Sequence, residues 1–139
     1  MKLQVITIAE TTYSSDNVTS CTIPTAAGEI TVLNRHIPLI SLVQPGVIKV
    51  VHKDNEIEFL AISKGLLEVR TTADNDTEIV ILADQADRAN SLDMSVVERA
   101  RERAREALDK PHTLSETEYR NLVADLAMQE ARIKAGSRL

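Results

Sequence analysis

The sequence predicts a β + α protein, with an N-terminal antiparallel β-sandwich followed by a C-terminal two-helix antiparallel hairpin. Turn signals recur every nine to eleven residues in the middle of the first part, a spacing typical of sandwiches built from short strands. From Asp84 onward the two-residue alternation of strands stops, and glycine is absent until Gly136. Apolar residues and alanines then recur at helical spacing. The change of period therefore separates a sandwich from a helical segment.

Eight apolar runs in the first part are predicted to be strands. In the first run Leu3 and Val5 alternate with Lys2 and Gln4, as the two faces of a strand do. The second run is ended by Pro24. The predicted strands are residues 2–8, 18–23, 30–33, 39–43, 47–51, 57–62, 66–70 and 78–83.

The central stretch, residues 28–51, fixes the order of these strands. Gly28 and Pro45-Gly46 bracket two apolar runs, and a third run follows directly. Proline presets φ and glycine adds a position without a Cβ atom, which together favour a tight reversal. This stretch is therefore predicted to be the middle of an antiparallel meander.

The first helix is predicted within residues 91–110. Ser91 is one candidate N-cap, and Ser95 with Glu98 three residues later is a capping-box pattern that gives a rival start. Lys110-Pro111-His112 ends the helix, because proline disfavours helical geometry in the residue before it. The apolar arc of this helix comprises Val96, Val97, Ala100, Ala104, Ala107 and Leu108.

The second helix is predicted to open at the capping box Ser115 to Glu118 and to run to about Lys134. Small residues on both helices allow close approach, which favours an antiparallel pair joined by a short loop. A hairpin this thin buries little on its own and should dock against the sandwich. The expected face of the second helix comprises Tyr119, Leu122, Val123, Leu126 and Ile133, with Ala124, Ala127 and Ala131 beside it.

Charge is divided unevenly between the two predicted domains, residues 1–86 and 87–139. The first carries six Lys and Arg against eleven Asp and Glu, a net charge of −5, whereas the second carries ten of each. A negative sandwich repels phosphates, and an aromatic content of 2% provides no base-stacking platform. Nucleic acid is therefore excluded as a partner.

Composition and motifs also argue against catalysis, metal binding and a bound cofactor. Cys21, the single cysteine, sits among predicted strand residues and is expected to be a buried small hydrophobe. The four glycines make no phosphate-binding loop, and the three histidines have no metal-ligand spacing.

No apolar run approaches the ~18 residues of a transmembrane helix, and the N-terminus is not a secretory signal.

The sharpest charge feature is the run from Glu98 to Glu106. It holds four arginines within seven residues, Arg99, Arg101, Arg103 and Arg105, interleaved with glutamates. Local pairs on a solvated helix face explain this pattern most simply, each contributing about 0.2–0.5 kcal/mol. Guanidinium groups also pair with carboxylates in bidentate geometry, so the run is a candidate contact for an acidic partner.

Several motifs in this order and spacing resemble the epsilon subunit of F-type ATP synthases over nearly the whole chain. The central signature combines Gly28-Glu29-Ile30, His36-Ile37-Pro38-Leu39 and Pro45-Gly46. The similarity continues through residues 65–69, 80–84, 86 and 88–89, and ends at Leu92-Asp93. It implies the same sandwich and hairpin that the periodicities predict.

The resemblance implies a non-catalytic rotor subunit in the central stalk of a proton- or sodium-driven ATP synthase. Its partners would be the gamma subunit, the membrane ring of c subunits and the beta subunits of the catalytic head. Glu29, Asn34, Arg35 and His36 match the ring-facing edge. The hairpin of this family can extend along gamma and restrain ATP hydrolysis, which would bring the four arginines to beta. Such a subunit is peripheral, on the cytoplasmic or equivalent face of an energy-transducing membrane.

Two departures from the family pattern bear on the site. Asn34-Arg35 stands where relatives often have Pro-Gly, so a different turn is expected there. Some relatives bind ATP at a box of Ile or Leu, Asp, two residues and Arg-Ala; here Asp93 is present, but Val96-Val97 replaces Arg-Ala. Asp93 is thus the remaining candidate for nucleotide binding. A nucleotide-sensing subunit and a free-standing adaptor with the same architecture are the alternatives.

Overall fold

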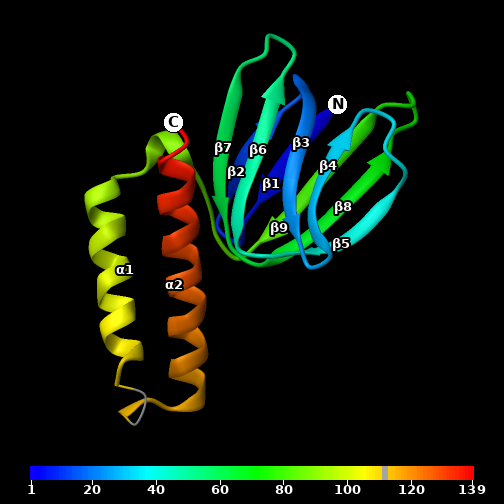
Figure 1. Cartoon of the computed structure of the whole chain (residues 1–139). Coiled ribbons are helices and arrows are strands. Elements are labelled where there is room, and N and C mark those ends of the chain that lie inside the picture. The colour runs from blue at the N-terminus through cyan, green and yellow to red at the C-terminus, as the bar shows by residue number, and fades with distance from the viewer. Residues whose placement is uncertain (111–112) are drawn as a thin grey trace.

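The computed structural model describes residues 1–110 and 113–139, and shows a β-sandwich with a helical hairpin against one side (Figure 1). The strands are β1 (Lys2–Ile6), β2 (Thr11–Ser15), β3 (Val18–Thr25), β4 (Gly28–Leu33), β5 (Leu39–Val43), β6 (Gly46–His52), β7 (Ile57–Ile62), β8 (Gly65–Thr71), β9 (Thr77–Ala83) and β10 (Ala86–Arg88). The 3-10 turn η1 (Ala89–Ser91) leads to α1 (Met94–Leu108) and α2 (Glu116–Gly136). The predicted fold class is confirmed.

The strands form one continuous sheet that folds over into two layers. Its order is β10-β7-β6-β3-β5-β8-β9-β1-β2, with β4 paired to β3 off this path. The two layers meet where Thr25 of β3 pairs with Val43 of β5. All pairs are antiparallel except β1 with β9, which run parallel. The predicted meander over residues 28–51 is wrong, because β4 pairs with β3, and β3 also lies between β5 and β6 in the sheet. The chain passes between the two layers at Pro45-Gly46 instead of turning back within one sheet, and β1 joins β9 as a parallel strand.

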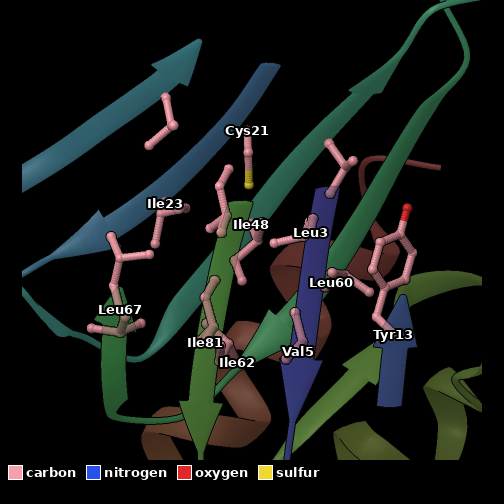
Figure 2. Packing of buried hydrophobic residues seen from close by; sticks show 14 of the residues in the cluster. Leu3, Val5, Tyr13, Cys21, Ile23, Ile48, Leu60, Ile62, Leu67 and Ile81 are labelled. Atoms are coloured by element: carbon pink, nitrogen blue, oxygen red, sulfur yellow. The ribbon is translucent and has the colours of Figure 1, made fainter. Parts of the chain in front are cut away.

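An aliphatic core fills the space between the layers, as the low aromatic content predicts. Alternate residues of each strand point inward, and Leu3, Ile23 and Ile81 are completely buried (Figure 2). Burying such a side chain contributes about 1.5–3 kcal/mol. Cys21 is also buried, and burial raises the pKa of its thiol to about 12. The expectation that Cys21 is a small core residue is confirmed.

Strand boundaries agree with the prediction for β5 and β7, and differ by one or two residues at one or both ends of the other six predicted strands. β3 continues through Pro24, because proline lacks only the donor and the Pro24 carbonyl still accepts a hydrogen bond from the Gln44 amide at 3.0 Å. β1 ends at Ile6 rather than at residue 8. The strands β2 and β10 were not predicted, since β2 has a single buried apolar side chain, Tyr13, and β10 has three residues. The proposed domain boundary after residue 86 falls within β10.

Helix α1 begins one residue after Asp93, so neither predicted serine cap is correct. The Asp93 carboxylate accepts hydrogen bonds from the amides of Ser95 and Val96 at 3.1 and 3.4 Å, whereas Ser91 ends η1. Aspartate is a strong N-cap because it satisfies donors that lack partners within the helix. Helix α1 ends at Leu108; the predicted terminator, Pro111-His112, lies outside the described residues.

Helix α2 starts as predicted, because Ser115 and Glu118 make both hydrogen bonds of a capping box. The helix continues two residues beyond Lys134, to Gly136. Neither α1 nor α2 has an apolar stretch long enough to cross a bilayer.

The hairpin docks on the sandwich through the C-terminal half of α2, which packs against β6, β7 and η1. The expected face of α2 is only partly correct, because Tyr119 and Val123 stay 47% and 44% exposed. The first half of α2 extends past the sandwich (Figure 1), so burial begins further along the helix. The apolar docking cluster consists of Val47, Ala61, Ala89, Met128, Ala131 and Ala135, with Phe59 packed against it.

A polar cluster closes the sandwich on the side where β2 and β10 end the sheet. The Tyr13 hydroxyl donates to Glu58, whose carboxylate also accepts from His52 Nε2 at 2.8 Å. Arg88 lies over the Tyr13 ring, 4.8 Å from its centre, with a guanidinium nitrogen 3.9 Å from Glu58. Burial opposes the charge of Glu58, but the hydrogen bonds from Tyr13 and His52 and the electrostatic attraction of His52 and Arg88 outweigh it and lower the pKa of Glu58.

Replacing Glu58 with Gln should destabilise the protein at neutral pH by about 1–3 kcal/mol, because hydrogen bonds to a charged acceptor are lost. The pKa of Glu58 is lower in the folded protein than the ordinary 4.5. Its charge therefore stabilises the fold above pH 4.5, and this contribution disappears as the pH falls through the folded pKa. Urea unfolding of the two proteins should converge at low pH. Glu56→Gln, at an exposed position just before β7, is the control; an undiminished difference near pH 3 contradicts the assignment.

Candidate functional site

The residues expected to face the ring lie on β4 and in the turn that follows it. In the described part of the chain β4 pairs with β3 alone, so its other edge is free. Glu29 is exposed at the start of β4, next to the β3–β4 turn, whereas Asn34, Arg35 and His36 follow its end (Figure 1). Five residues of strand span roughly 16 Å. The structure therefore does not gather these four residues at one point, but places them along one free strand edge.

The turn after β4 holds Arg35 in the left-handed region, with φ 66°. The Arg35 amide donates to Thr77 Oγ1 at 2.7 Å, and the His36 amide donates to the Leu33 carbonyl at 3.1 Å. Glycine adopts this conformation freely, whereas another residue is strained by about 1–2 kcal/mol. Arg35 stands at the glycine of the family pattern and adopts a backbone conformation that glycine reaches without strain. Leu33 and Ile37 flank the turn and are 56% and 75% exposed.

A row of leucines crosses the outer face of the layer that contains β5, β8 and β9. Leu66 of β8 lies opposite Leu42 of β5 on one side and Leu82 of β9 on the other. These three side chains are 60% (Leu42), 41% (Leu66) and 49% (Leu82) exposed, and Ile40 on the same strand as Leu42 is 70% exposed. A contiguous apolar patch of this kind marks an interaction surface.

Sequence reasoning missed this leucine row, although a signal for it was present. Consecutive residues of a strand point to opposite faces. The doublets Leu66-Leu67 and Ile81-Leu82 thus place one apolar side chain in the core and one outside. Strands that are apolar on both faces are normally covered on both. The doublets therefore indicate a second, outward-facing contact.

The four arginines of α1 separate into two pairs. Arg99 and Arg103, one turn apart, are exposed, and Arg99 Nε donates to the Ser95 carbonyl at 3.2 Å. Arg101 and Arg105 both reach Glu102, at 3.6 and 3.7 Å, and Arg105 also reaches Glu130 of α2 at 3.4 Å. The second pair is thus engaged in contacts of the hairpin, while Arg99 and Arg103 face solvent.

Asp93, the candidate for nucleotide binding, serves as the cap of α1. Its carboxylate accepts from the Ser95 hydroxyl at 2.8 Å in addition to two backbone amides. The hydrogen bond from the Ser95 side chain is the main cause that lowers the pKa of Asp93, followed by that from the Val96 amide. Val96, at the place of the box arginine, is 48% exposed and offers no charge.

Comparisons with known proteins agree on one family. Residues 1–89 match the family described as ATP synthase, Delta/Epsilon chain, beta-sandwich domain. An ATP synthase epsilon chain from Nitrosococcus oceani is 32% identical over 96% of this chain and 91% of its own length. One from Bordetella petrii is 32% identical over 100% of this chain and 93% of its own length.

Solved structures show the same fold. A chain of the Euglena gracilis mitochondrial ATP synthase assembly with OSCP, F1 and c-ring superposes with a TM-score of 0.75 at 22% identity, over 93% of this chain and 76% of that one. A chain of the Tetrahymena thermophila mitochondrial ATP synthase central stalk and c-ring gives 0.57 at 17% identity, over 98% and 96%. With the sandwich match and full-length relatives above 30% identity, the chain belongs to the ATP synthase epsilon chain family.

Proposed function

We propose that this chain is a non-catalytic rotor subunit of the central stalk, which couples an ion-driven c-ring to the catalytic head and restrains ATP hydrolysis through its hairpin. The observation that carries the proposal is the similarity to epsilon chains over both the sandwich and the hairpin. The chain also presents three separate surfaces suited to protein partners: the leucine row, the β4 edge and the arginines of α1. Co-purification with gamma and c subunits is the direct test, and a free-standing adaptor would fail it.

The leucine row is the surface that we assign to the gamma subunit. A rotor subunit must stay bound while torque passes through it, which requires an apolar contact that salt does not screen. Leu42, Leu66 and Leu82 provide such a contact on the rigid face of a sheet.

The free edge of β4 is the surface that we assign to the c-ring. Glu29 and Arg35 offer opposite charges at its two ends, and Leu33 and Ile37 add exposed apolar area beside the turn. A long, narrow contact of this kind can follow the rim of a ring. The membrane-facing position of the subunit follows from this contact.

Substituting Leu66 with Glu should reduce the affinity for gamma by at least about tenfold, because a charge would be buried at the centre of the contact. Leu66 is 41% exposed, so the sandwich itself should remain folded. Ile57→Glu is the matched control, because Ile57 is similarly exposed, at 47%, but lies on β7, in the layer that does not carry the leucine row. Binding to isolated gamma, measured by calorimetry, should change for the first variant alone. Equal effects of the two variants would remove the leucine row as the gamma surface.

Changing Arg99, Arg101, Arg103 and Arg105 to Ala should raise ATP hydrolysis by the assembled enzyme while synthesis and assembly persist. Each exposed pair contributes about 0–1 kcal/mol, but several together can shift a two-state hairpin. Because Arg99 and Arg103 face solvent, the double Ala variant at these positions should give most of the effect. Native inhibition should also weaken as salt rises. Arg120→Ala on α2 is the control, and unchanged hydrolysis by the fourfold variant would leave the run as a solvated helix face.

ATP should not bind to the isolated chain more tightly than about 1 mM. Val96 cannot donate charge-assisted hydrogen bonds to phosphate, and Asp93 is committed to capping α1. Calorimetry with ATP and Mg²⁺ measures this directly. A micromolar affinity would support the nucleotide-sensing alternative.

A further inference from the structure

The apolar contact between the hairpin and the sandwich is built mainly from small side chains. Four alanines meet there, Ala61 and Ala89 of the sandwich and Ala131 and Ala135 of α2, and the larger side chains at the contact are Val47, Phe59 and Met128. Alanine buries little area, so each such contact adds little free energy. Helix α1 packs on α2, and α2 alone makes the extended contact with the strands. The four alanines of the seam therefore contribute little of the free energy that holds the hairpin docked.

One ion pair reinforces this seam, and just after α2 the guanidinium of Arg138 lies 5.7 Å from the centre of the Phe59 ring. Arg132 Nε donates to Asp87 Oδ2 at 2.8 Å, and a terminal nitrogen of Arg132 donates to Gln85 Oε1 at 3.3 Å. The side chains of Arg132 and Asp87 are 20% and 33% exposed, so water screens them only in part.

Among the ion pairs of the described residues, Arg132–Asp87 is the one that joins a hairpin helix to the sandwich. Arg105–Glu130 joins α1 to α2, and Arg120–Glu116 lies within α2 with both side chains at least 75% exposed. Arg132–Asp87 thus joins the hairpin to the sandwich, Arg105–Glu130 joins the two helices, and Arg120–Glu116 connects two residues of α2.

The sandwich presents Asp87 from a fixed backbone. Asp87 is the middle residue of β10 and lies opposite Ala61 of β7 in the sheet. Because neighbouring strand residues point to opposite faces, Asp87 faces α2 while Arg88 turns to Glu58 and the ring of Tyr13. The carboxylate is therefore positioned before the helix arrives, which lowers the entropy lost on docking.

We propose that Asp87 and Arg132, with Gln85, form a latch that holds the hairpin docked on the sandwich. Removing one partner leaves the other charge partly buried without its counterion, so each single substitution weakens docking more than the loss of a surface pair. The latch also makes docking sensitive to salt, whereas the alanine seam is not. The latch acts in the isolated chain, and it does not depend on whether the hairpin restrains ATP hydrolysis.

Docking can be measured as a distance in the full chain. Lys64 and Asn121 are exposed and line one crevice of about 280 Å³ between the sandwich and α2. Spin labels on cysteines at these two positions report the separation by pulsed electron resonance. The native Cys21 is completely buried with a raised thiol pKa and stays unlabelled.

The labelled parent should give one short distance, and Arg132→Ala should raise the ratio of undocked to docked chains by about tenfold or more. Asp87→Asn should do the same, and high salt should move the parent in the same direction. Exchanging the charges, Asp87→Arg with Arg132→Asp, should restore docking in part. Arg120→Ala, which removes the exposed pair of α2, should leave the distance unchanged.

Two outcomes would overturn the latch. One is a distance distribution of Arg132→Ala that matches the parent at low and high salt. The other is an equal shift in Arg120→Ala, which would trace the change to loss of helical charge. Arg132→Gln is the reserve variant in case Asp87 substitutions unfold β10, and far-ultraviolet circular dichroism checks that the strands remain. The distance is measured in the isolated chain and does not depend on ATP hydrolysis. A negative result would therefore contradict the latch without contradicting the proposed function.

Discussion

The pairing of β3 is the constraint on which both halves of the sandwich depend. Strand β3 pairs with β4 along one edge and with β6 and β5 along the other. In the described part of the chain β4 has no further partner, so it is the last strand of its layer and has a free edge. The sheet continues from this layer into the other through the Thr25–Val43 pair, at which β5 is hydrogen-bonded to β3. The two surfaces assigned to the ring and to gamma therefore both follow from the way in which β3 is shared.

The sequence allowed the architecture to be predicted because the relevant signals are local. Pro45-Gly46 marks the boundary between β5 and β6, and the box of Ser115 and Glu118 marks a helix start, without reference to distant residues. Which strands then pair is not local, so the meander expected around Pro45-Gly46 did not form. Where two local signals competed, the outcome depended on geometry. Asp93 provides the cap of α1 because its carboxylate reaches two amides, although the serines on either side are equally good caps by residue type. Strands such as β2, with one apolar side chain, give too weak a pattern to be recognised.

The candidate site was less accessible from sequence, since its parts meet only in three dimensions. Asp87 and Arg132 are 45 residues apart, and nothing in their neighbours shows that they pair. The leucine row needs the register of three strands before its members line up. The four arginines look equivalent in the sequence, yet Arg105 bridges the two helices while Arg103 faces solvent. Resemblance to a family assigned Glu29 and His36 to one edge, and the structure shows how far along that edge they are separated.

The small side chains of the docking seam have a consequence for aggregation. A helix that docks through leucines or phenylalanines uncovers a large adhesive patch whenever it lifts, and such patches promote aggregation. Here four of the seven apolar residues at the contact are alanines, Ala61, Ala89, Ala131 and Ala135, and the larger ones are Val47, Phe59 and Met128. Each alanine that parts from its neighbour exposes little apolar area to other molecules. The directional contacts are the Asp87–Arg132 ion pair and the guanidinium of Arg138 over the Phe59 ring, so charged groups provide the specificity of docking and the small side chains favour its reversibility.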